Sequence, residues 1–412
     1  PTPTPPPSPL AGSLQRQDPV RAVPADGRQM AIVEARIALA DGGAATGRLV
    51  HLRPLDALWP AQATDPVQVV PLDGRLRFAV SGTRAGRVTF GLFDAAGWSG
   101  DEPLATVEVE LARKVVVLAP GFQSALARRY LTFGQPQACQ EPADPRSITE
   151  ALMCLGYEPE TTIVDMAWEA APCTPQEAAE DPPRLRCVAT IAPTTDGTDV
   201  VWQPADYDLT DLALSMLRQR QVDLWGHRLA RTIATYDQQL RETAGVPASF
   251  FLVGHSLGGQ VVVRSLRAIL DDPELLAYFE QGSPGLLQAV VSVDGALNWE
   301  GTVQLVGDTG CGFPVRTVAD ERRARDNADA VQAAHAALGT LTVAMTSATD
   351  PIVTPDVALL RDPRPSAGYV ESLHHLDGGV TGCSHNALLW PEPTGFPLRD
   401  VLEEHIGPAA GD

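Results

Sequence analysis

A serine between glycines lies in the middle of the chain, where an apolar run gives way to a helical pattern. The run is residues 251–253 (FLV), and residues 254–259 (GHSLGG) follow it directly. Glycines on both sides of a serine let the backbone pack closely around a sharp strand-to-helix turn. Such a turn holds the serine oxygen clear of the sheet, at the positive end of a helix dipole. The spacing therefore predicts that Ser256 is a nucleophile.

Two segments resemble the lipase and esterase branch of the α/β-hydrolase superfamily. Residues 254–259 are similar to its nucleophile elbow, and residues 115–122 (VVVLAPGF) are similar to its strand and oxyanion loop. Pro-Gly followed by an aromatic residue is also similar to bacterial cutinases and polyester hydrolases. The resemblance extends from about residue 114 to the C-terminus. It implies that the backbone N–H groups of Phe122 and Leu257 form the oxyanion hole, worth about 3 kcal/mol each in the transition state.

A serine hydroxyl needs a base to take its proton and an acid to orient that base. In this family the acid and then the histidine follow the serine along the chain. Residues 382–389 (GCSHNALL) are similar to the family's terminal histidine loop, which implies that His385 is the base. His374 and His375, at the end of the preceding predicted strand, are the alternatives. Neighbouring strand residues point to opposite faces, so these two do not suggest a metal site.

The acid is expected just beyond the carboxyl end of a strand. Asp350 follows a predicted strand at residues 341–345 and precedes an Ile-Val-Thr-Pro turn, which resembles the acid loop of the family. Asp294, which follows the predicted strand at residues 289–293, is the rival, because some lipases carry the acid at that position. Asp377 is a more distant third choice.

The N-terminal part of the chain alternates apolar and polar residues, as in strands with one buried face. The alternating segments are residues 33–39, 76–80, 88–92 and 105–111. Turn signals such as Asp73-Gly74 separate them. We expect a small immunoglobulin-like β-sandwich over residues 17–112, after a proline-rich linker at residues 1–16. A competing interpretation assigns its last two strands to the next sheet.

Beyond Lys114 the pattern changes to short apolar strands separated by helical stretches. The expected strands are residues 115–118, 161–166, 249–253, 289–293, 341–345 and 369–373, and a helix is expected at residues 224–240. This alternation predicts a mostly parallel sheet covered by helices on both faces. Residues 113–412 are therefore expected to form an α/β-hydrolase domain. Residues 135–210 and 300–335 are long for connections and are expected to be lids or substrate-binding insertions.

The six cysteines favour an exported protein with disulfides, since none has the CxxC spacing of a zinc or redox site. Neighbours along the chain suggest the pairs Cys139–Cys154 and Cys173–Cys187, which leaves Cys311–Cys383. Other pairings remain open. No apolar run approaches the 18 residues of a membrane-spanning helix. The expected location is therefore secreted or on the cell surface.

The formal net charge of −20 argues against nucleic acid and anionic lipid as partners, because both are bound by Lys and Arg. No motif suggests a nucleotide, a flavin or a metal, so no cofactor is expected, and nothing locates a structural calcium site.

These residues together predict a secreted serine hydrolase that cleaves carboxylic esters through an acyl-enzyme, as a lipase or carboxylesterase does. A cutinase-like polyester hydrolase, a thioesterase and an acyltransferase with the same triad remain alternatives. So does a non-catalytic surface protein whose β-domain binds a surface or a polymer.

Overall fold

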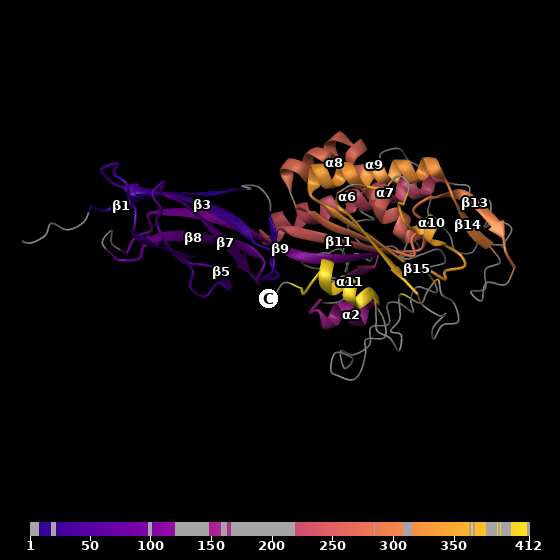
Figure 1. Cartoon of the computed structure of the whole chain (residues 1–412), viewed down its shortest axis with the longest axis horizontal. Coiled ribbons are helices and arrows are strands. Elements are labelled where there is room, and N and C mark those ends of the chain that lie inside the picture. Colours follow the sequence, from indigo (N-terminus) through magenta and orange to yellow (C-terminus); the bar gives the residue numbers. More distant parts are fainter. Residues whose placement is uncertain are drawn as a thin grey trace, which may run out of the picture. The chain divides into compact units, whose positions relative to one another are not determined.

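The computed structural model describes most of the chain, and Figure 1 shows its helices and strands. The described residues are 8–17, 22–97, 101–119, 148–157, 163–165, 219–283, 285–307, 315–361, 364–365, 367–375, 385, 388 and 397–409. Their contacts divide the chain into two compact units. Unit 1 contains residues 1–114, 244–249 and 409–412, and unit 2 contains residues 115–243 and 250–408.

Unit 1 is a β-sandwich. Its strands are β1 (Leu10–Arg16), β2 (Val23–Pro24), β3 (Ala31–Leu39), β4 (Leu49–Pro54), β5 (Ala61–Ala63), β6 (Val67–Val69), β7 (Arg75–Gly82), β8 (Gly86–Asp94) and the first part of β9 (Ala105–Ala119). One sheet has the order β1-β3-β7-β5, and the other has the order β9-β8-β4-β6. All these neighbours pair antiparallel, whereas β2 runs parallel to β9.

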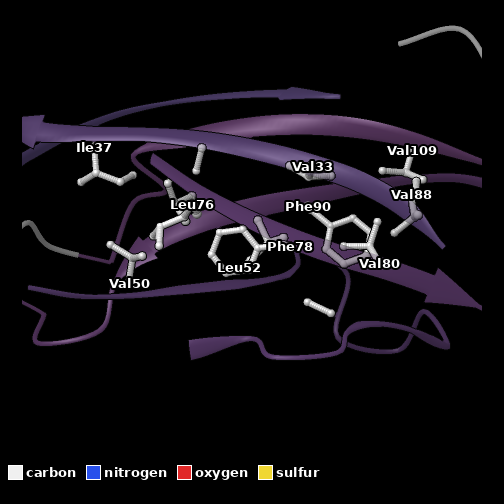
Figure 2. Packing of buried hydrophobic residues seen from close by; sticks show 14 of the residues in the cluster. Val33, Ile37, Val50, Leu52, Leu76, Phe78, Val80, Val88, Phe90 and Val109 are labelled. Atoms are coloured by element: carbon white, nitrogen blue, oxygen red, sulfur yellow. The ribbon is translucent and has the colours of Figure 1, made fainter. Parts of the chain in front are cut away.

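The predicted alternation accounts for the core of unit 1. In β3, β7 and β8 every second side chain is buried, and these side chains meet between the two sheets. Figure 2 shows Phe78 of β7 and Phe90 of β8 among aliphatic neighbours such as Leu52 and Val33. Each fully buried Phe or Leu contributes roughly 1.5–3 kcal/mol relative to an exposed one.

The first strand corrects the expected linker. Residues 10–16, assigned to the linker at residues 1–16 in the sequence analysis, form β1 and pair with β3 from Leu10↔Leu39 to Arg16↔Val33. Within residues 1–16 every proline precedes Leu10, so no backbone N–H of β1 is missing from this ladder. Residues 1–7 lie outside the described residues.

Unit 2 combines one sheet with helices. Its helices are α2 (Ile148–Cys154), α6 (Gln219–Ala244), α7 (Leu257–Asp271), α8 (Pro273–Ala277), the short π-helical turn η3 (Tyr278–Gly282), α9 (Glu321–Leu338), α10 (Pro355–Ala358) and α11 (Pro397–His405). Its strands are the last part of β9, β10 (Ile163–Asp165), β11 (Ala248–His255), β12 (Leu287–Val293), β13 (Trp299–Leu305), β14 (Val315–Ala319), β15 (Leu341–Ser347) and β16 (Tyr369–His374).

The sheet of unit 2 has the order β10-β9-β11-β12-β15-β16. The pairs β10–β9, β11–β12, β12–β15 and β15–β16 are parallel, as the sequence predicts. In Figure 1, α6, α7, α8 and α9 lie on one side of this sheet, and α2 and α11 lie on the other. β11 and β12 are buried along their whole length, which explains why they are continuous apolar runs.

The segment at residues 300–335 differs from the insertion expected there. Its second half is helix α9, which begins after the N-cap Asp320 and packs against α7, so this part is an ordinary connection to β15. The remaining part is the antiparallel hairpin β13–β14, whose tip at residues 308–314 lies outside the described residues. Only residues 148–157 and 163–165 of the other expected insertion, at residues 135–210, are described. Within the described part of the chain, no helix is both long and apolar enough to cross a membrane.

Candidate active site

Ser256 lies at the junction of β11 and α7 in a conformation that L-residues rarely adopt. β11 ends at His255, α7 begins at Leu257, and Ser256 between them has φ 54° and ψ −120°. Such a conformation costs on the order of 1–3 kcal/mol, and it persists only where the surroundings enforce it. The backbone N–H of Ser256 donates to the carbonyl of Val293 at the end of β12 (3.0 Å), which fixes the turn against the neighbouring strand.

Two glycines of the motif are required by close packing. A Cβ on Gly254 would overlap the backbone of Gly258, and a Cβ on Gly259 would lie 2.5 Å from the hydroxyl oxygen of Ser292. No side chain larger than hydrogen fits at either position without a backbone shift. The turn is therefore built by backbone contact between the end of β11, the first turn of α7 and the end of β12.

Asp350 follows β15 and is held in a tight turn. Its Oδ1 accepts hydrogen bonds from the N–H groups of Ile352 (2.8 Å) and Val353 (2.9 Å). Its Oδ2 accepts from Nδ1 of His385 at 2.6 Å. The carboxylate is buried and receives three donors, so both of its oxygens have hydrogen-bond partners.

His385 is buried beside the serine turn. Its ring lies 4.9 Å from the ring of His255, centre to centre, and Nε2 of His255 donates to the backbone carbonyl of His385 (3.0 Å). Because Nδ1 of His385 donates to Asp350, Nε2 is the basic nitrogen of its neutral ring. Ser256 and His385 form no mutual hydrogen bond in the described structure; such bonds often tighten only when substrate is present.

The two histidines of this site have opposite pKa shifts. Burial lowers the pKa of His385, but the neighbouring Asp350 carboxylate raises it by more, so that the net pKa lies above the ordinary value of 6.5. Burial and the nearby His385 lower the pKa of His255 to about 3. His255 is therefore neutral at physiological pH and acts as a donor that holds the His385 backbone.

Asp294, the rival acid, occupies a different position in the same site. It is fully buried directly after β12, with φ 43°, and its Oδ1 accepts from the N–H of Ser347 (2.8 Å) and the hydroxyl of Thr346 (2.9 Å). Its Oδ2 has no hydrogen-bond partner among the described residues. Asp350, and not Asp294, is thus the carboxyl that binds His385.

One described group of side chains has the composition of a metal site. His255, Asp294 and His385 are buried and place one potential ligand atom each within 4.8 Å of one another. One ring nitrogen of each histidine already donates a hydrogen bond inside the site, Nε2 of His255 to a carbonyl and Nδ1 of His385 to Asp350. This bonding pattern matches a base, His385, whose ring is oriented by Asp350 and whose backbone is held by His255.

Several predicted site residues are not described. Phe122 of the expected oxyanion hole lies outside the described residues, whereas Leu257 is the first residue of α7. Cys154 is disulfide-bonded, and the other five cysteines lie outside the described residues. The three pairings therefore remain predictions.

Two residues of the hairpin support the acid turn, although their sequence gives no signal of this role. Thr317 of β14 donates both its N–H and its hydroxyl to the carbonyl of Ile352, each at 2.8 Å. Arg316 donates from Nε to the carbonyl of Pro351 (3.3 Å). These contacts join residues about 35 positions apart, so no local sequence motif predicts them.

An apolar cluster lies between the serine turn, the hairpin and the acid turn. Its buried members are Ala296, Trp299, Val353, Val357 and Ala358. Leu257, Val303 and Ile352 pack against them and are only partly buried. Partly exposed apolar side chains thus follow both Ser256 and Asp350 in the chain.

Comparison with known proteins gave similarities to solved structures alone. No protein-family model matches the chain, and no curated protein matches it. The esterase domain of a Rhodothermus marinus protein is 14% identical, with a TM-score of 0.32, over 74% of this chain and 94% of that one. A candidate carboxylesterase from Lactobacillus plantarum is 14% identical, with a TM-score of 0.34, over 87% of this chain and 99% of that one.

Bacterial adhesins are similar to about a quarter of the chain. The D00-D0 domain of intimin is 16% identical, with a TM-score of 0.20, over 24% of this chain and 47% of that one. Invasin, a bacterial integrin-binding protein, is 17% identical, with a TM-score of 0.20, over 26% of this chain and 19% of that one. The chain thus spans less than half the length of these two adhesin structures.

Proposed function

We propose that the chain is a serine ester hydrolase of the α/β-hydrolase type, a carboxylesterase or lipase that uses Ser256, His385 and Asp350. The observation that carries the proposal is the buried contact of 2.6 Å between His385 Nδ1 and Asp350 Oδ2. It provides an imidazole with a fixed tautomer and a raised pKa, next to a strained serine at the start of a helix.

In the proposed mechanism Ser256 Oγ attacks the ester carbonyl carbon while Nε2 of His385 takes the hydroxyl proton. Asp350 stabilises the imidazolium that forms. The N–H groups of Leu257 and Phe122 donate to the oxyanion, and the first N–H groups of a helix have no partner inside it. When the carbon–oxygen bond to the alcohol breaks, Nε2 returns the proton to the leaving oxygen. Water then attacks the acyl-enzyme with the same base, which releases the acid and restores the Ser256 hydroxyl.

The surroundings of the site favour esters with apolar acyl groups. Leu257, Val303 and Ile352 are partly buried apolar side chains packed on one cluster, and two of them lie one or two positions from Ser256 and Asp350. Burying an acyl chain against such side chains is favourable by roughly 25 cal/mol per Å².

The proposal includes export from the cytosol, and it assigns catalysis to residues 113–412. The disulfide of Cys154 supports export, since such bonds persist mainly in oxidising compartments. The β-sandwich is proposed to act as a spacer or to contact a surface.

Hydrolysis of p-nitrophenyl esters, from acetate to palmitate, tests the proposed function. We expect turnover by the wild type and a loss of about 10³-fold or more in Ser256→Ala, with thermal unfolding unchanged. Thioesters and polyester film in the same assay distinguish the alternative substrates. Turnover by a folded Ser256→Ala variant equal to that of the wild type would contradict the serine mechanism.

A further inference from the structure

The proposed mechanism does not use Asp294, although this residue is strained, buried and close to the base. Among the described residues, Asp294 and Ser256 are the only non-glycine residues with positive φ. Strain of this kind is retained where the surrounding structure enforces it, and it is concentrated at functional sites. A carboxyl oxygen of Asp294 lies within 4.8 Å of a ring nitrogen of His385.

Hydrogen bonding distinguishes the two buried carboxyls. Asp350 receives three donors, which are shared between both of its oxygens. Asp294 receives two, both on Oδ1, while its buried Oδ2 has no partner among the described residues. An ionised carboxylate oxygen buried without a donor is far more costly than a neutral one. The geometry therefore assigns the negative charge to Asp350 and a proton to Asp294.

The groups around Asp294 favour the same assignment. The titratable groups that face it are His255 at the end of β11, Asp350 after β15, and His385. β15 presents the Thr346 hydroxyl and the Ser347 N–H, and the backbone of Gly259 in α7 lies against Gly295, the residue after Asp294. His255 is neutral, and His385 is the base that is paired with Asp350. Burial and the Asp350 charge accordingly raise the pKa of Asp294 well above that of an ordinary carboxyl.

We propose that Asp294 is a neutral carboxylic acid in the working enzyme and acts as a positioning residue for the Asp350–His385 pair. Its Oδ1 holds the end of β15, from which the turn that carries Asp350 begins. Its proton avoids a second negative charge beside His385, since two carboxylates so close to one base cannot both ionise at little cost. The role in catalysis rests on the proposed function, whereas the protonation state does not.

Kinetics of three variants test the positioning role. Asn is an isostere of the neutral acid, so Asp294→Asn keeps the acceptor for Thr346 and Ser347, and we expect kcat/KM to fall by at most about tenfold. Asp294→Ala removes that acceptor, and a shift of the turn by about 1 Å would lower kcat by about 10²-fold with little change in KM. Asp350→Asn should lose about 10⁴-fold. If Asp294→Asn is as damaging as Asp350→Asn, or does not fold, the assignment is wrong.

Stability measured against pH tests the proton without any need for activity. A carboxyl whose pKa is raised by folding binds more protons in the folded state, so stability declines as the pH rises above the ordinary carboxyl pKa of about 4. The measurement is urea unfolding of the wild type and of Asp294→Asn from pH 5 to 9. The ratio of the wild-type unfolding equilibrium constant to that of the variant should rise by up to about tenfold per pH unit. The rise should stop once the pH passes the pKa of Asp294 in the folded protein. Parallel curves for the two proteins would overturn the proposal even if both hydrolyse esters.

Discussion

The carboxylate of Asp350 sets the pH range in which the proposed base is active. His385 is buried, and burial alone would lower its pKa, but the Asp350 contact raises it above 6.5. The base must be neutral to accept the serine proton. Activity should therefore rise with pH through a step centred above the ordinary histidine pKa.

Replacing Asp350 with Asn should move that step and lower its height. The variant loses the charge that raises the His385 pKa but keeps the burial that lowers it, so the acidic limb of kcat/KM shifts to lower pH. At the plateau we expect a loss of about 10⁴-fold, because the imidazole loses its orienting acceptor. The measurement is kcat/KM from pH 5 to 9. If the acidic limb of the variant's kcat/KM profile lies at the same pH as that of the wild type, Asp350 does not raise the pKa of His385.

At the scale of elements, the hairpin β13–β14 supports the turn that carries the acid. Thr317 makes two hydrogen bonds to the carbonyl of Ile352, whose own N–H donates to Asp350. The Thr317 side chain is therefore one peptide unit away from the groups that fix the carboxylate. An element outside the main sheet thus supports the geometry of the site.

Replacing Thr317 with Val should lower turnover while leaving substrate binding nearly intact. Val keeps the shape but leaves the Ile352 carbonyl with one donor, which costs about 1 kcal/mol of stability and loosens the acid turn. We expect kcat to fall by about tenfold, with KM little changed. Thr317→Ser should restore most of the activity because it restores the hydroxyl. The exposed neighbour Val318, changed to Ala, provides the control. Equal kcat for the Val and Ser variants would contradict this role.

The sequence predicts those elements whose signals are local. β11, the serine turn and α7 appear as an apolar run, GHSLGG and a helical pattern, and the structure has them at those residues. β15, followed by Asp350, is equally local. Helix α9 was not expected from the sequence, because its mean hydropathy is low and Ala is frequent in it, so its apolar stripe is hard to recognise. The contacts of Thr317, and the pairing of His385 with Asp350 in preference to Asp294, depend on residues that only the folded chain brings together.

At the scale of the whole molecule, each of the two units has its own core, and β9 contributes residues to both. Its first part pairs with β8 in unit 1, and its last part pairs with β10 in unit 2. Lys114, the only lysine of the chain, is fully buried in unit 1 and forms an ion pair of 2.9 Å with Asp26. Asp26 also accepts from the N–H groups of Arg28 and Gln29, so this pair connects β9 to the loop after β2.

Replacing Lys114 with Met should destabilise the protein by about 3–5 kcal/mol, because it leaves the Asp26 carboxylate buried without its cation. The double variant Lys114→Met/Asp26→Asn removes both charges and should recover most of that loss, since Asn still accepts from Arg28 and Gln29. Urea unfolding of the single and double variants measures both effects. A single variant within 1 kcal/mol of the wild type would show that the pair contributes little.

Covalent labelling of the intact chain tests the central claim most directly, because a fluorophosphonate reacts with a serine that a neighbouring base activates. The account predicts one adduct per folded chain, on the peptide that contains Ser256, and no adduct in Ser256→Ala. Labelling of His385→Ala should be slower by about 10³-fold or more. Intact-mass measurement followed by peptide mapping gives the answer. A folded chain that takes up no label, or an adduct on another residue that persists in Ser256→Ala, would contradict the assignment of a serine hydrolase.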